Sequence, residues 1–373
     1  MSGPLTGLTI LEMAAIGPVP LAGQLMADLG ATVIIVDKNS QATQSDDINR
    51  RNKQSVAINL KSPDGRDVFL KLVSTADVLL EGFRPGVMEK LSLGPMECRE
   101  CNAALIYGRM TGWGQEGPLS RTAGHDINYL AITGALHAIG SKEGPPVPPL
   151  NLVADYAGGA MFLVMGVLAA VHERQLSGKG QTIDVAMIDG VPSIMGFIQN
   201  LYRREQWLPA RQSNMLDGGA PYYRCYKTSD GEFISVGAIE PPFFKIFITL
   251  AGLPESDLSI QNDRNHWPDM HKRYEAHFLA CTRDEWMLKF EGSDACVAPV
   301  LSFDEAPLHP HNSARDVFKG TEFEASPAPR FDRTPVHQPA APVAAGSSTD
   351  DVLASLGYSV DELKQLRSNG ALV

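Results

Sequence analysis

Residues 9–37, TILEMAAIGPVPLAGQLMADLGATVIIVD, decide the fold. Residues 9–13 and 32–37 are short apolar runs typical of buried strands, and the segment from Leu21 to Leu29 has the amphipathic pattern of a helix that ends at Gly30. The second strand ends in an acidic residue, Asp37, as in dinucleotide-binding folds. The turn after the first strand has no G-x-G-x-x-G motif, however, so we expect neither a nicotinamide nor a flavin cofactor.

The same alternation of strands and helices continues along the chain. We expect further strands at 55–60, 78–81, 105–109 and 182–185, helices at 63–74 and near 87–91, and one long helix over 187–203. This order predicts an α/β fold with a mostly parallel, doubly wound sheet, in which ligands gather beyond the carboxyl ends of the strands.

The pattern changes near residue 216. Two hairpin-like strands, 222–226 and 232–236, flank the turn Ser229-Asp230-Gly231, and helices follow at 243–251 and 267–279. These elements predict a smaller α+β domain. Residues 326–348 are rich in Pro and Ala, which is typical of a linker or extended arm, and 351–367 predict one or two terminal helices.

Composition excludes several classes of protein. The 373 residues include 32 basic and 43 acidic side chains, a net charge of -11, which argues against nucleic-acid binding and means that a polyanionic ligand needs a local basic patch. Five cysteines at irregular spacing favour a reducing compartment. We find no signal-peptide pattern, and we interpret the apolar run 152–171 as a buried helix because it contains Asp155 and a Gly-Gly pair. We therefore expect a cytoplasmic protein with no membrane partner.

Three separated segments each present one isolated acid/base group. His125 lies in GHDINY (124–129), Asp155 is the only charged residue of 151–171, and Glu240 ends an apolar run before two prolines. Each has an ordinary structural interpretation, since a carboxylate in a first helical turn is favoured by the helix dipole. Three such groups together favour acid/base chemistry. Asp126, which follows the histidine, is better interpreted as a residue that caps or positions a helix.

Four longer motifs carry a family resemblance. They are GHDINYLAITGALHAIG (124–140), PPLNLVADYAGGAMFLVMGVLAA (148–170), LDGGAPYYRCYKTSDGEFISVGAIEP (216–241) and DACVAPVLSFDEAP (294–307). From about residue 3 to about residue 340 the chain resembles the α-methylacyl-CoA racemases, within the family III CoA-transferase superfamily. The resemblance implies a Rossmann-like CoA-binding domain (1–187), a linker (188–215), a small α+β domain (216–304), a second linker (305–330) and a C-terminal segment (331–373) that returns to the large domain. It also implies an interlocked homodimer.

The resemblance further implies an isomerase that interconverts (2R)- and (2S)-2-methylacyl-CoA thioesters through an enolate. His125 and Glu240 would act as a pair on one face of the substrate and Asp155 on the other. We expect no metal and no cofactor besides the coenzyme A of the substrate. Two alternatives remain open: a family III CoA-transferase that uses Asp155 as a nucleophile, and a non-catalytic acyl-CoA-binding protein.

The resemblance also places contacts to coenzyme A on several segments. They are Lys38, Ile58, Asn59, Leu60, Lys61, Gly82, Phe83, Arg84, Lys90, and the whole of Gly124, His125, Asp126, Ile127, Asn128 and Tyr129. Lys38 and Lys90 depart from the family pattern, which has arginine, and a lysine lacks the bidentate guanidinium fork. Arg50, Arg51 and Lys53 form a basic cluster nearby, either part of the same patch or a solvated surface run.

Overall fold

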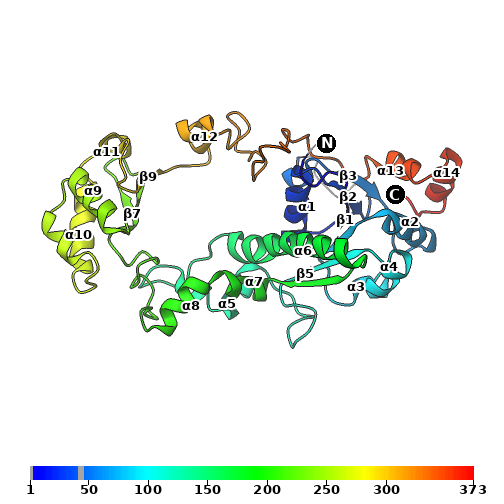
Figure 1. Cartoon of the computed structure of the whole chain (residues 1–373), viewed down its shortest axis with the longest axis horizontal. Coiled ribbons are helices and arrows are strands. Elements are labelled where there is room, and N and C mark those ends of the chain that lie inside the picture. The colour runs from blue at the N-terminus through cyan, green and yellow to red at the C-terminus, as the bar shows by residue number, and fades with distance from the viewer. Residues whose placement is uncertain (1–2, 41–45) are drawn as a thin grey trace. The chain divides into compact units, whose positions relative to one another are not determined.

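The computed structural model describes residues 3–40 and 46–373. The chain forms two compact units (Figure 1). The large unit comprises Met1–Thr133, Leu150–Ile194 and Glu324–Val373, and the small unit comprises Gly134–Pro149 and Met195–Phe323. The sequence-based boundaries differ from this division chiefly at residues 134–149, which they place in the large domain. Arg211 accounts for the difference, because its guanidinium donates to the carbonyls of His137, Ser141 and Gly144 and so fastens this loop to the small unit.

The large unit is built on six parallel strands, as the alternating pattern predicts. They are β1 (Thr9–Met13), β2 (Thr32–Asp37), β3 (Gln54–Ala57), β4 (Val78–Glu81), β5 (Ile106–Thr111) and β6 (Thr182–Ala186). Their order in the sheet is β3-β2-β1-β4-β5-β6, so the chain runs outward from β1 in one direction and outward from β4 in the other. The switch point therefore lies between β1 and β4, where a doubly wound sheet leaves a crevice.

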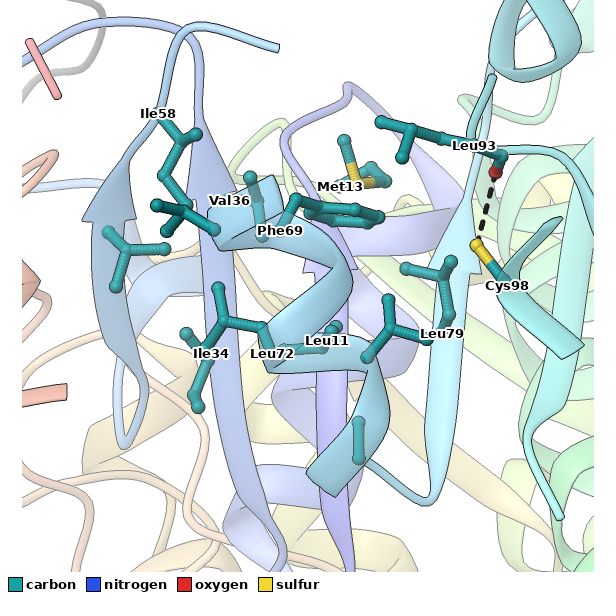
Figure 2. Close-up of a cluster of buried hydrophobic side chains, with 14 of the residues drawn as sticks. Leu11, Met13, Ile34, Val36, Ile58, Phe69, Leu72, Leu79, Leu93 and Cys98 are labelled. Carbon is teal, nitrogen blue, oxygen red and sulfur yellow. Dashed lines mark hydrogen bonds between the residues drawn. The ribbon is translucent and has the colours of Figure 1, made fainter. Parts of the chain in front are cut away.

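One face of this sheet is covered by helices from both ends of the chain. Leu11, Ile34, Val36 and Leu79 of the strands pack with Phe69 and Leu72 of a helix in one buried cluster (Figure 2). The covering helices are α2 (Pro63–Thr75), α4 (Pro95–Cys101), α13 (Thr349–Ser355) and α14 (Val360–Ser368). The Cys98 thiol donates to the Leu93 carbonyl at 3.3 Å, so this buried cysteine serves packing (Figure 2).

The opposite face carries α1 (Pro18–Asp28) and α6 (Met161–Ser177). A Cβ at Gly108 of β5 would lie 3.1 Å from Leu163 of α6, so glycine allows this helix to approach the sheet closely. The prediction that the apolar run is a buried helix is only partly right, since Leu163 and Val167 are buried while Met161 and Met165 are more than half exposed. The helical stretch Leu152–Ser177 is long enough and apolar enough to span a membrane, judged by length and composition alone.

The C-terminal segment returns to the large unit and is held by backbone contacts. Ile58 forms a bridge with Leu372, and the Asn59 amide donates to the Ala371 carbonyl at 2.8 Å. The Ala57 amide donates to the Thr349 hydroxyl at 3.1 Å. The end of the chain thereby continues the sheet edge beside β3.

The basic cluster that follows β2 is neither a surface charge run nor part of a ligand patch. Arg50 pairs with Asp37, Arg51 with Asp28, and Lys53 with Glu12, with nitrogen to oxygen distances of 2.7, 2.5 and 2.6 Å, and all six side chains are at most 5% exposed. Burial raises the pKa of Glu12 to about 7, although Lys53 lowers it, and burial lowers the pKa of Lys53. Sequence alone missed these pairs because their partners lie 13 to 41 positions away.

The small unit is an antiparallel sheet with helices on one face. Its strands β7 (Tyr223–Lys227), β8 (Phe233–Gly237) and β9 (Val297–Val300) are joined in that order. An aromatic core lies between the sheet and α9 (Pro241–Ala251), α10 (Trp267–Phe278) and α11 (Arg283–Phe290). The hairpin and the first two helices confirm the predicted α+β pattern, while the sequence missed β9 and α11.

One predicted helix is wrong. Residues 187–203 form two helices, α7 (Met187–Ile194) and α8 (Gly196–Arg203), with a break at Met195. Pro192 lies inside α7 and removes one amide donor from its hydrogen-bond ladder, which weakens the helix shortly before the break. The remaining short elements are η1 (Ile48–Arg50), α3 (Val87–Lys90), α5 (Asp126–Ile132), η2 (Leu136–Ala138), the π-helix η3 (Leu152–Ala160), η4 (Glu255–Ile260), η5 (Ala306–Leu308) and α12 (Pro310–Ala314).

We predict that Lys53→Met destabilises the fold by about 3–5 kcal/mol, because it leaves the buried Glu12 carboxylate without its partner. The double variant Glu12→Leu with Lys53→Met removes both charges and should recover most of the loss. Urea unfolding of the wild type, Lys53→Met, Glu12→Leu and the double variant measures the coupling between the two residues. Equal stability of the single and double variants would contradict the prediction.

Candidate active site

A cavity of about 520 Å³ lies at the carboxyl edge of the parallel sheet, where β1 and β4 are neighbours. Three loops that follow strands form much of its wall: residues 16–19 after β1, 82–85 after β4 and 110–113 at the end of β5. The segment 120–129 and the π-helix complete it. The cavity therefore occupies the switch point, where the topology predicts a ligand site.

The π-helix Leu152–Ala160 presents Asp155 to this cavity. Glycines allow the helix to sit against its neighbours, because a Cβ at Gly158 would lie 3.0 Å from the Val191 amide nitrogen and a Cβ at Gly190 would lie 1.9 Å from the Gly158 carbonyl oxygen. A Cβ at Gly17, which begins α1 with a φ of 76°, would lie 3.5 Å from the Asp155 carboxylate. Turns of π-helix are frequent at functional sites.

The Asp155 carboxyl is half-buried, and its pKa is raised above the ordinary value. Burial is the main cause, since it disfavours the charged form, and the neighbouring Asp126 carboxylate raises the pKa further. A hydrogen bond from Asn151 and the charge of His125 act in the opposite direction. Asp155 is therefore suited to exchange a proton closer to neutral pH than an exposed aspartate does.

His125 lines the same cavity and is exposed to solvent. It occupies the N-cap of α5 with extended backbone dihedrals, and its own amide donates to Asn128 Oδ1 at 3.0 Å. This bond uses the His125 main chain, and the residue forms part of the cavity wall. The structure thus brings two of the three predicted acid/base residues to one cavity.

Asp126 does not face the cavity but serves the π-helix. Its side chain is 6% exposed, and its Oδ2 accepts hydrogen bonds from the amides of Ala154 and Asp155, each at 2.8 Å. This contact agrees with the interpretation of Asp126 as a residue that caps or positions a helix. The expected contact of Asp126 with coenzyme A stays a prediction.

Two aromatic rings support the segment before His125. Trp113 and Tyr129 pack edge to face with centroids 4.7 Å apart, and the Tyr129 hydroxyl donates to the Gly124 carbonyl at 2.5 Å. A Cβ at Gly112 would lie 2.0 Å from the Tyr129 ring, so this position requires glycine. Burial raises the pKa of Tyr129, and Asp155 adds to the effect. The tyrosine therefore remains a hydrogen-bond donor at neutral pH.

A buried charge network fixes the turn that carries Phe83 and Arg84. Glu81, which is fully buried at the end of β4, accepts from the Phe83 amide at 2.7 Å and from Arg109 Nε at 2.9 Å. Arg109 in turn donates to both carboxylate oxygens of Glu89. The turn is therefore held by the buried Glu81 side chain. Arg84 is exposed and lies in the cavity wall.

The other residues predicted to contact coenzyme A fall into three groups. Gly82, Phe83, Arg84, Gly124 and Tyr129 line the cavity with His125. Lys38, Lys61, Lys90, Ile127 and Asn128 are exposed outside its lining. Ile58, Asn59 and Leu60 are committed elsewhere, because Ile58 lies in the core with Leu60 packed against it and the Asn59 side chain donates to the Gly370 carbonyl.

Glu240 belongs to the small unit. It is exposed at the N-cap of α9, next to Cys296, whose thiol pKa is raised by burial and by the Glu240 charge. A second hollow of about 600 Å³ lies on the uncovered face of the small sheet and is lined by Tyr223, Cys225, Ser235 and Cys296. The pairing of Glu240 with His125 stays a prediction.

Sequence reasoning missed several residues of the cavity wall. Ile16, Val19, Asn151, Tyr156 and Met187 line it as well. The first two follow the end of β1, so a ranking of every loop at the carboxyl edge would have found them. Among residues 3–40 and 46–373, no three or more His, Cys, Asp or Glu side chains gather in a way that could hold a metal ion.

Comparison with known proteins gives a consistent family. The model of CoA-transferase family III matches residues 5–349. The chain is 42% identical over 370 residues to the mouse α-methylacyl-CoA racemase, covering 98% of this chain and 96% of that protein, and 41% identical over 372 residues to the human one, with the same coverage. The crystal structure of a CaiB/BaiF family protein from Brucella suis superposes with a TM-score of 0.81 at 22% identity, over 95% of this chain and 100% of that one, which shows the shared fold.

We predict that Gly112→Ala lowers the free energy of unfolding by about 1–3 kcal/mol, because the new methyl group overlaps the Tyr129 ring and must displace it. Gly196→Ala is the matched control, since a Cβ there meets nothing within 4 Å. Thermal and urea unfolding of both variants tests the prediction. It fails if the two substitutions change stability equally.

Proposed function

The chain belongs to CoA-transferase family III, and we propose that within this family it is a racemase that interconverts (2R)- and (2S)-2-methylacyl-CoA thioesters by 1,1-proton transfer. One observation carries the proposal. His125 and Asp155, which come from different segments, lie on the wall of one cavity at the switch point of the sheet. The identity to the mouse and human racemases over nearly the whole chain supports the same reaction.

The chemistry needs a base on one side of the α-carbon and an acid on the other. The thioester carbonyl makes the α-proton removable, because the charge spreads into an enolate oxygen, and the acid then returns a proton to the opposite face. A neutral imidazole and a protonated carboxyl can exchange these roles when the substrate has the other configuration. The raised pKa of Asp155 suits this exchange, since it increases the fraction of the protonated form at neutral pH.

The acyl-CoA is positioned by the turn at 82–84 and the segment 124–129 in this proposal. Arg84 is the cation of the cavity wall, and the buried Glu81 and Arg109 hold its turn in place. Lys38, Lys61 and Lys90 would neutralise phosphates farther from the thioester, as single charges without the arginine fork. The net charge of -11 makes such local cations necessary for a polyanionic substrate.

The remaining parts of the proposal rest on family resemblance. Glu240 orients the His125 imidazole and holds its tautomer, as carboxylates do in other histidine-based catalysts. The protein acts as an interlocked homodimer in the cytoplasm, with coenzyme A present only as part of the substrate. No nucleic acid or membrane takes part.

The alternative is a CoA-transferase in which Asp155 attacks the thioester as a nucleophile. Its position in the cavity would suit either role. A transferase, however, has no need of a base that faces the α-carbon, and His125 supplies one beside Asp155. The racemase therefore explains both groups.

We predict that one enantiomer of a 2-methylacyl-CoA, incubated with the enzyme in deuterium oxide, loses its α-proton signal by NMR while its configuration is scrambled. His125→Ala and Asp155→Ala should each slow the exchange by about 10²- to 10⁴-fold, since each removes one acid/base group. His172→Ala and Asp269→Ala are matched controls, because both side chains are exposed and lie outside the cavity lining. Retention of the α-proton, with coenzyme A passing to an added free carboxylic acid, would assign the transferase instead.

We also predict that Arg84→Ala raises KM for the acyl-CoA by about tenfold and leaves kcat nearly unchanged, because it removes one charge-assisted contact that substrate and transition state share. Arg99→Ala on α4 is the control, an exposed arginine outside the cavity lining. Steady-state kinetics at several salt concentrations measures the effect. An unchanged KM would remove Arg84 from the proposed site.

A further inference from the structure

The Asp126 side chain is hydrogen-bonded to the turn that carries Asp155, although the two residues are far apart in the sequence. Its Oδ2 accepts two amide hydrogen bonds, from Ala154 and Asp155, across 28 and 29 positions of the chain. Both bonds are 2.8 Å long and fix the backbone of Asp155 itself. The first turn of the π-helix is thereby tied to α5, whose N-cap is His125. The two candidate acid/base residues are held relative to each other by one carboxylate.

Capping alone does not explain why this residue is charged. The second oxygen, Oδ1, is buried and has no hydrogen-bond partner in the part of the chain that the structure describes. An unpartnered oxygen on a buried carboxylate destabilises a fold, and a neutral Asn, Ser or Thr also caps helix amides well. A buried carboxylate oxygen without a hydrogen-bond partner in a native fold therefore suggests a role other than stabilising the fold.

We propose that Asp126 is a positioning residue of the catalytic site: its carboxylate fixes the turn that carries Asp155 and places a second negative charge beside that group. This inference rests on the proposed racemase function. The Asp126 side chain faces the π-helix and is absent from the cavity lining, so the carboxylate acts through Asp155.

Within the described residues, several charged and titratable groups surround Asp155. The segment that begins α5 contributes His125, Asp126 and Tyr129, and Asn151 at the start of the π-helix donates a hydrogen bond to Asp155. The residue of α1 nearest to Asp155 is Gly17, which carries no charge. The acidic residue of α7, Asp189, acts on Asp184. Arg84 acts on Tyr129 from the turn after β4. Asp126 is the carboxylate that raises the pKa of Asp155, so removing its charge should change the titration of Asp155 in one direction.

That direction follows from the sign of the charge. A neighbouring anion disfavours ionised Asp155 and raises its pKa, so Asp126→Asn should lower it. A racemase works with one proton shared between His125 and Asp155, and it loses activity at low pH when both are protonated. The acidic limb of kcat/KM against pH therefore reports Asp155 and should move to lower pH in Asp126→Asn.

The experiment compares two substitutions at Asp126. Asp126→Asn keeps an oxygen that can accept the two amide bonds, so it should retain measurable racemisation with a shifted acidic limb. Asp126→Ala loses the bonds as well and should lower kcat/KM by about 10²-fold, the effect of misplacing a catalytic group by about 1 Å. Asp77→Asn is the control, because Asp77 also accepts a backbone amide, from Thr9 at 2.8 Å, but at the opposite edge of the sheet. Since Asp77 also pairs with Arg174 at 2.8 Å, the control is compared by its pH profile and not by its stability.

A second measurement does not depend on activity. Carbon-13 NMR of labelled aspartate, with the Asp155 signal assigned through Asp155→Asn, gives the Asp155 titration directly in the wild type and in Asp126→Asn. Failure of the wild type to exchange the α-proton would overturn the racemase and leave this titration interpretable. An unshifted Asp155 titration in a folded Asp126→Asn, or wild-type kcat/KM in Asp126→Ala, would overturn the role of Asp126. A uniform loss in both variants with an unchanged pH profile would also overturn it, since that is what a purely structural residue gives.

Discussion

The buried ion pair between Asp37 and Arg50 connects parts of the large unit that are far apart in the chain. Arg50 reaches both oxygens of Asp37, at the end of β2, and also donates to the Val343 carbonyl of the returning C-terminal segment. Ser55 donates to Asp37 and accepts from the Gly346 amide. The chain leaves the large unit after Ile194 and re-enters at Glu324, so the fold depends on contacts that hold the last fifty residues in place.

The same ion pair gives the acidic residue at the end of β2, Asp37, a structural role. In dinucleotide-binding folds an acidic residue at this place binds the ribose of the cofactor. Here the Asp37 carboxylate is 1% exposed and fully engaged by Arg50 and Ser55, so it is not available to a ligand. The strand order of a dinucleotide fold is thus kept, and the cavity still lies at the switch point, but Asp37 is not among its lining residues. Arg51 and Lys53 are also buried, and each forms an ion pair with an acidic residue inside the protein.

The candidate site depends on backbone held at close range. Gly158 and Gly190 let α7 contact the π-helix, and Gly112 leaves room for the Tyr129 ring. The Asp126 carboxylate holds the backbone amide of Asp155 by a hydrogen bond. None of these residues faces the substrate as an acid or a base. They decide where the acid/base groups lie, and in a reaction that requires groups on two sides of one carbon, position matters as much as chemical identity.

Local patterns were enough to predict the alternation of strands and helices, because short apolar runs and helical spacing are local properties, and β1, β2 and β4 were predicted residue for residue. The same patterns identified His125 and Asp155 as candidates, since an isolated charge in an apolar segment is visible without a fold. The folded chain was needed to see which of the predicted ligand residues share a cavity, why Ile58 and Asn59 lie outside it, and that Arg50, Arg51 and Lys53 are buried. The break at Met195, β9, and the amide bonds of Asp126 were equally out of reach. The physical reason is the same in each case: burial and pairing are set by residues distant in the chain, and a charge looks the same in sequence whether water or a buried counter-charge surrounds it.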